Sequence, residues 1–455
     1  MSLARTARIL QVTAVCTVAA ACTADHSITR PSGAIAVAAG DAQVGVAGER
    51  LAAPIVVEVD NASGAPAAGV AVTWNAEDGG AFEPATSITD ETGRAQAMWT
   101  LGDDRHPHTA VASAAGFSNA RFAALAATDG TLPLGVIVPL TLETYDGSGQ
   151  TVHPDYVATP ASWPAARRYL FITPYPDGNA GFENPSEFES ADPLHWNVPE
   201  GVTNPIVSPH DGYFSDPDAL YVPERNEVWL YFREVTSENV IRLTTSGDGE
   251  HWSPSVVVAH APNHEIISPS VVRRSATEWL MWSVNGNSGC GGADTKVELR
   301  RSTNGIDWSA PEPVDLTQPG VWPWHIDVEW VPSRNEFWAV YNVKTAGTCT
   351  TAALFLATSA DGVHWTTYPS PVLARGAAPE LRDVVYRSTF AYDPASDEIT
   401  FWYSGAKYTL GQYVWRSAVE RRSRSEVFAA IAAVGSGAPA ASTAPPILPP
   451  LTNFP

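Results

Sequence analysis

The segment Ser246-Gly-Asp248-Gly-Glu-His-Trp252 occurs four times in this chain with small changes. The other copies begin at Ser190, Ser302 and Ser359, and each ends in a tryptophan six residues later. The four tryptophans are 56, 56 and 57 residues apart. A fixed spacing of this size indicates one structural unit that is repeated along the chain.

Runs of aromatic and β-branched residues precede these segments in each repeat. Glu227–Phe232 and Glu336–Tyr341 are examples, and they alternate as short strands do. In the repeated segment, Asp or Asn can bond its own backbone, glycine supplies a positive φ, and tryptophan packs between neighbouring units. The segment therefore predicts a tight turn between two strands. Units of this size with several strands are typical of propeller blades, whose repeats span ~40–50 residues.

A fifth, partial copy follows the four complete repeats. Thr400–Tyr403 matches the aromatic strand and Tyr413–Arg416 matches the next strand, but no Asp-Gly turn follows. Five blades then fill residues 150–425. We expect their innermost strands to begin at His153-Pro-Asp155, Ser215-Asp216-Pro-Asp218, Ser268-Pro-Ser270, His325-Ile-Asp327 and Tyr386-Arg387-Ser388.

The 455 residues carry a formal net charge of −22. So acidic a chain argues against a nucleic-acid partner, because phosphates require a basic face. The charge suits an exported protein, or one whose ligand is neutral, such as a sugar.

Residues 1–22 have the pattern of a secretory signal. Two arginines precede a mostly apolar stretch, Ile9–Ala21, which is too short to span a bilayer. Ala19-Ala-Ala-Cys22 resembles a bacterial lipobox, in which Cys22 becomes the lipidated residue, although the first position is usually Leu. An ordinary cleavage before Cys22 is the alternative. Both outcomes predict export, and the lipobox would place the protein in the bacterial cell envelope with a lipid anchor as its only membrane contact.

Two cysteines, Cys290 and Cys349, lie beyond this signal. They precede the turns that begin at Ser302 and Ser359 by 12 and 10 residues, which places them in equivalent loops of adjacent blades. In an oxidising compartment this placement predicts a disulfide. Two buried free thiols and a two-cysteine metal site are the alternatives, but no spaced pair of histidines lies near enough to support a metal site.

Residues 37–128 have a different composition, rich in Ala and Val, with short alternating runs separated by turn signals. This pattern predicts a β-sandwich. The segment resembles a bacterial Ig-like domain of the Big_1 (invasin/intimin) type, through Gly40-Asp41, Gly64–Trp74 and Thr89–Ala95. The resemblance implies a stalk or spacer. At the other end, the Ala/Pro-rich residues 435–455 are predicted to be disordered or extended.

Blades place their innermost strands around a central axis, so residues at the starts of those strands converge. The converging polar residues are Asp155, Asp216, Asp218, Ser268, His325, Asp327 and Arg387. Hydrolysis of a glycosidic bond needs a carboxylate that activates water or attacks the anomeric carbon, and a second group that protonates the leaving oxygen. Trp324 and Tyr386 lie near the same mouth and are expected to stack on sugar rings. Together these residues predict a carbohydrate site.

Residues 150–425 resemble the five-bladed propeller glycosidases, a group that includes arabinanases, xylosidases and fructosidases (families 43, 32 and 117). The first two strand starts and the repeated turns carry the resemblance. It implies Asp155 as base or nucleophile and Asp216 as the group that tunes a pKa and positions the substrate. The acid in those families is usually a third-blade Glu, where this chain has Ser268-Pro-Ser270. Glu265 in the preceding loop and His325 on the fourth blade are the alternative acids.

A closer resemblance is to an uncharacterised glycosidase-like propeller group of bacteria and phages. Its matching residues are Thr173-Pro-Tyr-Pro176, Phe182-Glu-Asn-Pro-Ser186, Tyr386-Arg-Ser388 and Trp402-Tyr-Ser-Gly405. This resemblance covers nearly all of residues 150–425 but names no substrate.

The sequence thus predicts an all-β protein with an N-terminal Ig-like sandwich followed by a five-bladed β-propeller. Its predicted function is glycoside hydrolysis at the axis, with Asp327, Arg387, Trp324 and Tyr386 in substrate binding. A non-catalytic propeller that binds carbohydrate or another surface molecule is the alternative, as is a pure adhesion protein. We expect a monomer that binds carbohydrate and needs no cofactor, although the axial carboxylates would suit a structural Ca²⁺ ion.

Two carboxyl groups decide between hydrolysis and its alternatives. Hydrolysis requires Asp155 and Asp216 to lie open, with a third acidic group about 5–10 Å away. Capping of the two by Arg387 and His325 would count against it.

Overall fold

The computed structural model describes residues 33–433, with gaps at 42, 47, 49, 52, 104–106, 128–131, 133, 165–167, 191–195, 209–211, 263, 288, 346, 350 and 410. The predicted signal segment with Cys22 and the predicted tail at 435–455 lie outside the described residues. Within the described ranges, no helix is both long enough and apolar enough to cross a membrane. Strands dominate these ranges, so the all-β prediction is confirmed.

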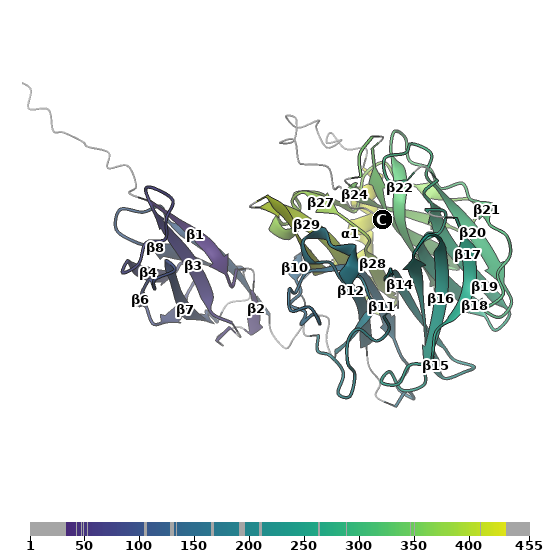
Figure 1. The fold of residues 1–455 in the computed structure, drawn as a ribbon, viewed down its shortest axis with the longest axis horizontal. Helices are drawn as coiled ribbons and strands as arrows, with labels where there is room; N and C mark the ends of the chain where they lie inside the picture. The colour runs from purple at the N-terminus through teal and green to yellow at the C-terminus, as the bar shows by residue number, and fades with distance from the viewer. Residues whose placement is uncertain are drawn as a thin grey trace, which may run out of the picture.

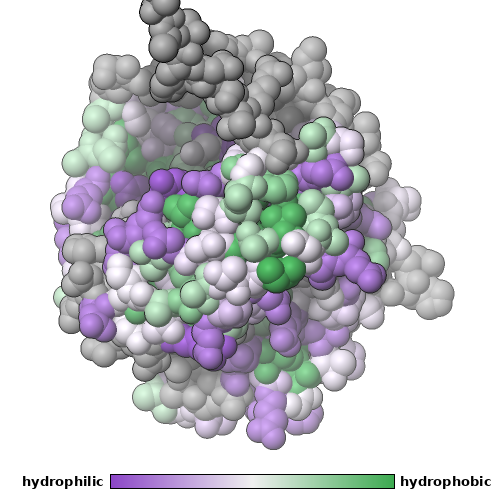
Figure 2. All heavy atoms as spheres, turned by 90° about the vertical axis from the view of Figure 1, so that its left-hand side faces the viewer, coloured by the Kyte–Doolittle hydropathy of each residue, from purple (hydrophilic) through white to green (hydrophobic). Residues whose placement is uncertain are grey.

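Two sheets form the N-terminal part of the described chain, at one end of the molecule (Figure 1). One sheet has the order β1 (Gly33–Ala39), β3 (Ile55–Asn61), β7 (Arg94–Leu101), β5 (Gly80–Glu83). The other has the order β2 (Gln43–Val46), β9 (Ala120–Ala127), β8 (Pro107–Ser113), β4 (Ala71–Ala76), β6 (Thr86–Ile88). Val57 and Trp99 from the first sheet share one core with Trp74 and Phe122 from the second. The face seen in Figure 2 mixes polar and apolar side chains, with apolar ones gathered near its centre.

Five further sheets follow, and together we call them the sheet ring. The first contains β11 (Thr151–Ala158), β12 (Arg168–Pro174) and β13 (Ser186–Ser190). The second contains β14 (Tyr213–Val222), β15 (Glu227–Val235), β16 (Asn239–Ser246) and β17 (Val256–Ala261). The third contains β18 (Ile267–Ser275), β19 (Glu278–Asn285), β20 (Lys296–Ser302) and β21 (Glu312–Pro313). All of these strands pair antiparallel with their neighbours.

The fourth sheet contains β22 (Trp322–Val331), β23 (Glu336–Lys344), β24 (Thr351–Ser359), β25 (Thr366–Thr367) and β26 (Leu373–Ala374). The fifth contains β27 (Val384–Val385), β28 (Thr389–Asp393), β29 (Glu398–Thr409), β30 (Gln412–Ser423) and β10 (Val138–Pro139). Short 3₁₀ turns lie at Pro176–Gly178, Ala180–Phe182 and Pro379–Leu381. Helix α1 (Arg424–Ala432) follows β30 and buries Val427 and Ile431.

The inner strands of the sheet ring contact one another in a closed circle (Figure 1). β11 lies against β14, β14 against β18, β18 against β22, β22 against β28, and β28 against β11. β10 precedes the first sheet in sequence, but it pairs with β30 at the outer edge of the last sheet. This pairing joins the two ends of the sheet ring. The predicted strand starts therefore do converge on one axis.

Side-chain hydrogen bonds link the inner strands in order from β11 to β28 around this axis. Asp155 Oδ2 accepts from the Ala219 N–H at 2.6 Å, and Asp218 Oδ2 accepts from the Val271 N–H at 2.8 Å. The next two bonds run from the Val328 N–H to Ser270 Oγ at 2.8 Å and from Thr389 Oγ1 to Asp327 Oδ2 at 3.0 Å. We call these four side chains the stitching residues. They satisfy polar groups that face a neighbouring sheet instead of a ladder partner.

The repeated turns pack one sheet against the next. In the copy at Ser359, the Gly362 N–H donates to Ser359 Oγ at 2.9 Å, and Asp361 Oδ1 accepts from the next two amides. Trp365 packs edge-on against Trp282 of the preceding sheet at 6.2 Å. The copies at Ser246 and Ser302 repeat this arrangement, with Trp252 against Phe171 and Trp308 against Tyr231. The turn in the copy at Ser190 lies largely outside the described residues.

Cys290 and Cys349 form the predicted disulfide, with their Cα atoms 4.9 Å apart. The bond joins the loop after β19 to the loop after β23, so it links adjacent sheets. The Gly347 N–H also donates to the Gly291 carbonyl at 3.1 Å beside it. The two loops are therefore held together by both a covalent and a backbone link.

We predict that Gly362→Ala destabilises the protein more than Gly320→Ala. Both glycines have positive φ, 77° and 74°. A Cβ at Gly362 would lie 2.6 Å from Trp282, whereas a Cβ at Gly320 would have nothing within 4 Å. Overpacking should cost Gly362→Ala about 1–3 kcal/mol beyond the strain that both variants share. Denaturant unfolding of the two variants measures the difference, and equal stability would contradict the predicted packing.

We predict that loss of the disulfide lowers the unfolding temperature. Closing a loop of 59 residues contributes stability on the order of 4 kcal/mol in the chain-entropy model. Thermal unfolding of the full chain with and without reductant, beside the double variant Cys290→Ser/Cys349→Ser, measures the effect. A double variant that unfolds at the same temperature as the oxidised protein would be the contrary outcome.

Candidate active site

Three inner strands carry the same backbone irregularity near their starts. His153, Asp216 and Ser268 have φ of 53°, 51° and 54°, which non-glycine residues seldom adopt, and each precedes a proline. The strand register shifts at each of these positions. Such bulges re-aim side chains and occur often beside functional sites. Here they turn the His153 and Asp216 side chains toward the axis.

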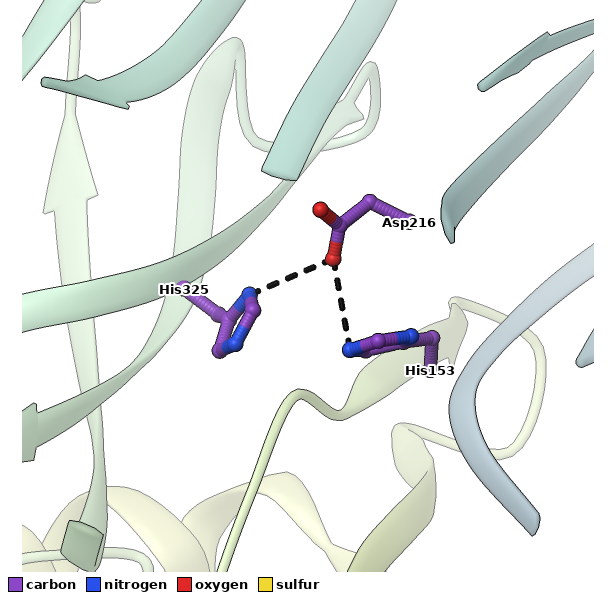
Figure 3. A group of neighbouring side chains, drawn as sticks. All are labelled: His153, Asp216 and His325. Carbon is purple, nitrogen blue, oxygen red and sulfur yellow. Dashed lines mark ion pairs between the residues drawn. The ribbon is translucent and has the colours of Figure 1, made fainter. Parts of the chain in front are cut away.

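His153, Asp216 and His325 point toward one another from β11, β14 and β22 (Figure 3). Asp216 Oδ1 lies 3.4 Å from His153 Nε2 and 3.4 Å from His325 Nδ1. The three side chains are 0–2 % exposed. We call them the His-Asp-His group.

The atoms that face one another in this group have no hydrogen-bond partner among the described residues. This holds for His153 Nε2, Asp216 Oδ1 and His325 Nδ1. Buried polar atoms are normally paired, so three that converge indicate a ligand between them. Two imidazoles and one carboxylate are the donors that Zn²⁺ and similar divalent ions accept, and 3.4 Å separations suit ligands about 2.0–2.2 Å from an ion. The residues present therefore fit a divalent metal ion.

The outer atoms of the group are held by second contacts. His153 Nδ1 lies 2.9 Å from Thr173 Oγ1, and Asp216 Oδ2 lies 2.9 Å from the Arg233 guanidinium. Arg233 also donates to Ser215 Oγ at 3.0 Å and is buried. Contacts of this kind orient metal-ligating side chains and set the imidazole tautomer.

The protonation states also suit a metal ion. Burial lowers the pKa of His153 well below its ordinary value and lowers the pKa of His325. Burial alone would raise the pKa of Asp216, but Arg233 and the two histidines outweigh it and hold that pKa well below its usual range. Two neutral imidazoles and one carboxylate result, which are the forms that bind metal.

Glu183 is a fourth ionisable group beside this site. It is 1 % exposed, and its Oε2 has no hydrogen-bond partner in the described part of the chain. Burial, and then the negative charge of Asp216, raise the pKa of Glu183 well above its ordinary value. A carboxyl group with a raised pKa is suited to exchanging protons with a substrate.

Aromatic rings surround the His-Asp-His group. The Tyr386 ring centre lies 4.4 Å from that of His325 and 5.2 Å from that of His153. Trp324, buried, lies 6.1 Å from His325. Tyr213, whose hydroxyl has no partner among the described residues, shares an electrostatic interaction with Glu183. The site is therefore lined by aromatic faces.

Four other predicted axial residues form a second group, one step further along the inner strands, whereas the Ser268 N–H donates to Asp216 Oδ2 at 3.3 Å. Arg387 Nη2 lies 3.9 Å from Asp155, 3.6 Å from Asp218 and 3.9 Å from Asp327. Burial raises the pKa of Asp218 to about 8 and that of Asp327 to about 6, although Arg387 opposes both shifts. The three carboxyl groups also hold the stitching bonds, so their geometry serves the fold.

Neither carboxyl group that hydrolysis requires lies open. Asp155 is 3 % exposed and sits beside Arg387, and Asp216 is buried beside His325. Glu265 is half-buried in the loop before β18, outside the His-Asp-His group. Of the four predicted catalytic residues, the structure thus brings only Asp216 and His325 together in this group. The catalytic roles of Asp155 and Glu265 stay predictions.

Three residues of the site were not singled out from the sequence. They are His153, Glu183 and Arg233. His153 occupies the same place in His153-Pro-Asp155 as Asp216 does in Asp216-Pro-Asp218, and this match was the available signal. Arg233 lies on a middle strand among aromatic residues, and no sequence pattern marks it.

No family model matches the chain. The chain is 29 % identical over 307 residues to the A type blood N-acetyl-α-D-galactosamine deacetylase of Flavonifractor plautii. This match covers 56 % of the chain but only 40 % of that relative, so the chain spans less than half of the relative's length.

Two solved structures are also similar to this chain. An N-acetylgalactosamine deacetylase from F. plautii, in complex with blood group B trisaccharide, is 25 % identical with a TM-score of 0.59, and the match covers 66 % of this chain and 97 % of that one. An α-L-arabinofuranosidase from Fusarium graminearum is 14 % identical with a TM-score of 0.42, covering 66 % and 99 %. The second likeness is too low to support an inference.

We predict that the protein binds one divalent transition-metal ion at the His-Asp-His group. Asp216→Asn and His325→Ala should weaken Zn²⁺ binding about 100-fold or more, because each removes a ligand, and Thr173→Val should weaken it about 10–100-fold through His153. Calorimetric titration of the metal-free protein with Zn²⁺ measures these affinities. His251→Ala is the matched control, because this exposed histidine pairs with Asp248 in a turn. Equal affinity in wild type and Asp216→Asn would contradict the site.

Proposed function

We propose that this protein is a carbohydrate-active enzyme that removes the acetyl group from an N-acetylated sugar, by metal-assisted amide hydrolysis at the His-Asp-His group. The observation that carries the proposal is the convergence of three buried ligand atoms from His153, Asp216 and His325, none of which has a hydrogen-bond partner among the described residues. The similarity to the F. plautii deacetylase supports the choice of substrate.

Amide hydrolysis requires a polarised carbonyl and an activated water. A divalent ion supplies both when bound, as a Lewis acid that also lowers the pKa of water. Three protein ligands are typical of catalytic metal sites, because they leave a position open for water or substrate. The three residues of the group meet that requirement. Arg233 pairs with the outer oxygen of the Asp216 carboxylate, Oδ2. This ion pair keeps the orientation of the Asp216 side chain fixed.

Glu183 is the proposed proton carrier. Its raised pKa favours the protonated carboxyl group, which can deliver its proton to the leaving amine nitrogen. Tyr386, beside both histidines, is the proposed wall against the sugar or its acetamido group. Tyr386 contacts both histidines, and Glu183 interacts electrostatically with Asp216.

Amide hydrolysis accounts for the geometry better than glycoside hydrolysis. A glycosidase uses two carboxyl groups that flank the bond it cleaves. In this chain Asp155 is held by Arg387 and the Ala219 amide, and Asp216 belongs to the His-Asp-His group. The earlier prediction of a glycosidase thus gives way to a deacetylase within the same broad class.

The finer predictions about architecture and location are part of this proposal. We infer that the sheet ring is a five-bladed propeller and that the two N-terminal sheets are an Ig-like spacer. The acidic composition and the signal-like N-terminus support export, with Cys22 as the lipidation site. A monomer that binds carbohydrate through the mouth of the propeller completes the proposal.

The test is acetate release from N-acetylgalactosamine and N-acetylglucosamine oligosaccharides, beside reducing-end release from the same mixtures. Wild type should release acetate, Glu183→Gln should lose about 10²–10⁴-fold in kcat, and Asp216→Asn should lose activity with its metal. His251→Ala should match wild type. Reducing-end release without acetate would restore the glycosidase, and binding without either product would indicate a carbohydrate-binding protein.

A further inference from the structure

A cavity of about 740 Å³ opens at the opposite end of the inner strands from the His-Asp-His group. Its lining begins at Asp155 and Asp218 and continues to the ends of β11, β14, β18 and β22. The His-Asp-His residues lie at the starts of the same strands and are not among the residues that line it. The cavity is therefore separate from the proposed active site.

One carboxyl group stands alone in an apolar ring of this cavity. The ring consists of Val157, Leu220, Val272 and Glu329, each two residues beyond a stitching residue, and of Ala391, two residues beyond Thr389. Glu329 is half-buried and makes no ion pair or hydrogen bond through its side chain with the residues that the structure describes. An unpaired carboxyl group in an apolar wall costs free energy, which a cationic ligand would recover.

Carboxyl groups outnumber basic side chains in this part of the molecule. Asp155 and Asp218, each less than 5 % exposed, share the Arg387 guanidinium with Asp327 at 3.6–3.9 Å. Asp155 Oδ1 has no closer cation than this among the described residues. The lining arginine, Arg273, is already paired with Glu224. Burial, together with Asp327 and Asp218, raises the pKa of Glu329 well above its ordinary value.

A metal ion does not suit this excess of carboxyl groups. The guanidinium of Arg387 already occupies the place between Asp155, Asp218 and Asp327 that a cation would take. It also donates to the Pro217 and Pro269 carbonyls, which fixes it there. The open position is the one beside Glu329, because Asp155 and Asp218, the other two carboxyl groups that line this cavity of about 740 Å³, already share Arg387. That position suits an organic ligand with one positive charge.

Aromatic side chains complete the wall. Tyr156, Tyr221, Trp330 and Tyr392 all line the cavity, and all are half-buried. Tyr156 is held flat by stacking on Trp402 at 4.1 Å, and the Tyr221 and Tyr392 hydroxyls are tied to Asn226 and Asp397. Fixed aromatic faces attract cations and accept the apolar faces of sugar rings.

We propose that this cavity is a second, non-catalytic binding site for a sugar that carries a free ammonium group, which pairs with Glu329 while its ring lies on the aromatic wall. The assignment to sugars rests on the proposed function, because deacetylation of an N-acetylated sugar yields an amino sugar. Such a site would keep the enzyme on a glycan that it has already partly deacetylated.

Direct binding to the full chain tests this site. The probes are galactosamine, N-acetylgalactosamine and cyclohexylamine, titrated into wild type, Glu329→Gln and Asp216→Asn and followed by calorimetry. Wild type should bind galactosamine at least tenfold more tightly than either other probe, Glu329→Gln should lose at least tenfold in that affinity, and Asp216→Asn should keep it. Glu312→Gln, an exposed residue of the outer strand β21, is the matched control, and thermal unfolding checks that each variant is folded.

Each other outcome overturns the proposal. Equal affinity of wild type and Glu329→Gln for galactosamine would remove Glu329 from the site. Loss of binding in Asp216→Asn alone would place the amino sugar in the active site as a product. Equal binding of cyclohexylamine would remove the assignment to sugars. Because none of these readouts needs acetate release, failure of the proposed enzymatic function would be detected separately.

Discussion

The sheet ring depends on one constraint, which is that neighbouring inner strands share no ladder of backbone hydrogen bonds. Between sheets, buried N–H groups must find other partners, and each one left unpaired costs about 1–3 kcal/mol. Asp155, Asp218 and Ser270 meet this need by accepting from backbone N–H groups of the next inner strand, and Asp327 accepts from the Thr389 hydroxyl. Three of the four are carboxyl groups, so the solution brings negative charge onto the axis, and Arg387 offsets part of it. The acidic axis is thus first a requirement of the fold.

The hydrogen bonds of the stitching residues fix the relative positions of the strands that carry the His-Asp-His group. His153, Asp216 and His325 each lie two residues before a stitching residue, on strands whose positions the stitches fix relative to one another. The bulges at His153 and Asp216 then turn these side chains into the axis at the cost of a strained φ. Ligating side chains that are already held in place lose less conformational freedom when an ion binds. A metal centre requires such pre-organised side chains.

The sequence predicted the sheets, their turns, the starts of the inner strands and the disulfide. Each of these features has a local signal in residue type or spacing. No such signal showed which polar residues of each inner strand stitch the fold and which form the His-Asp-His group. Asp155 and Asp216 were both predicted as axial catalytic carboxylates, yet Asp155 follows its proline and stitches the fold, whereas Asp216 precedes its proline and faces two histidines. A left-handed φ at a residue before proline is not what sequence patterns predict, so the bulge that separates these roles was missed. Glu183 and Arg233 were missed because they reach the axis from outside the inner strands.

The position of β10 in the last sheet has a consequence for how the molecule is made. Val138 and Pro139 pair with Val419 and Ala418, so two segments almost 280 residues apart must meet before the circle is complete. During synthesis the early strands leave the ribosome long before their closing partner exists, and open sheet edges remain exposed in the interval. The N-terminal sandwich contains its own core and can fold in that interval. The topology therefore implies an order of assembly in which the His-Asp-His side chains come together late, after the fourth inner strand has joined the first two.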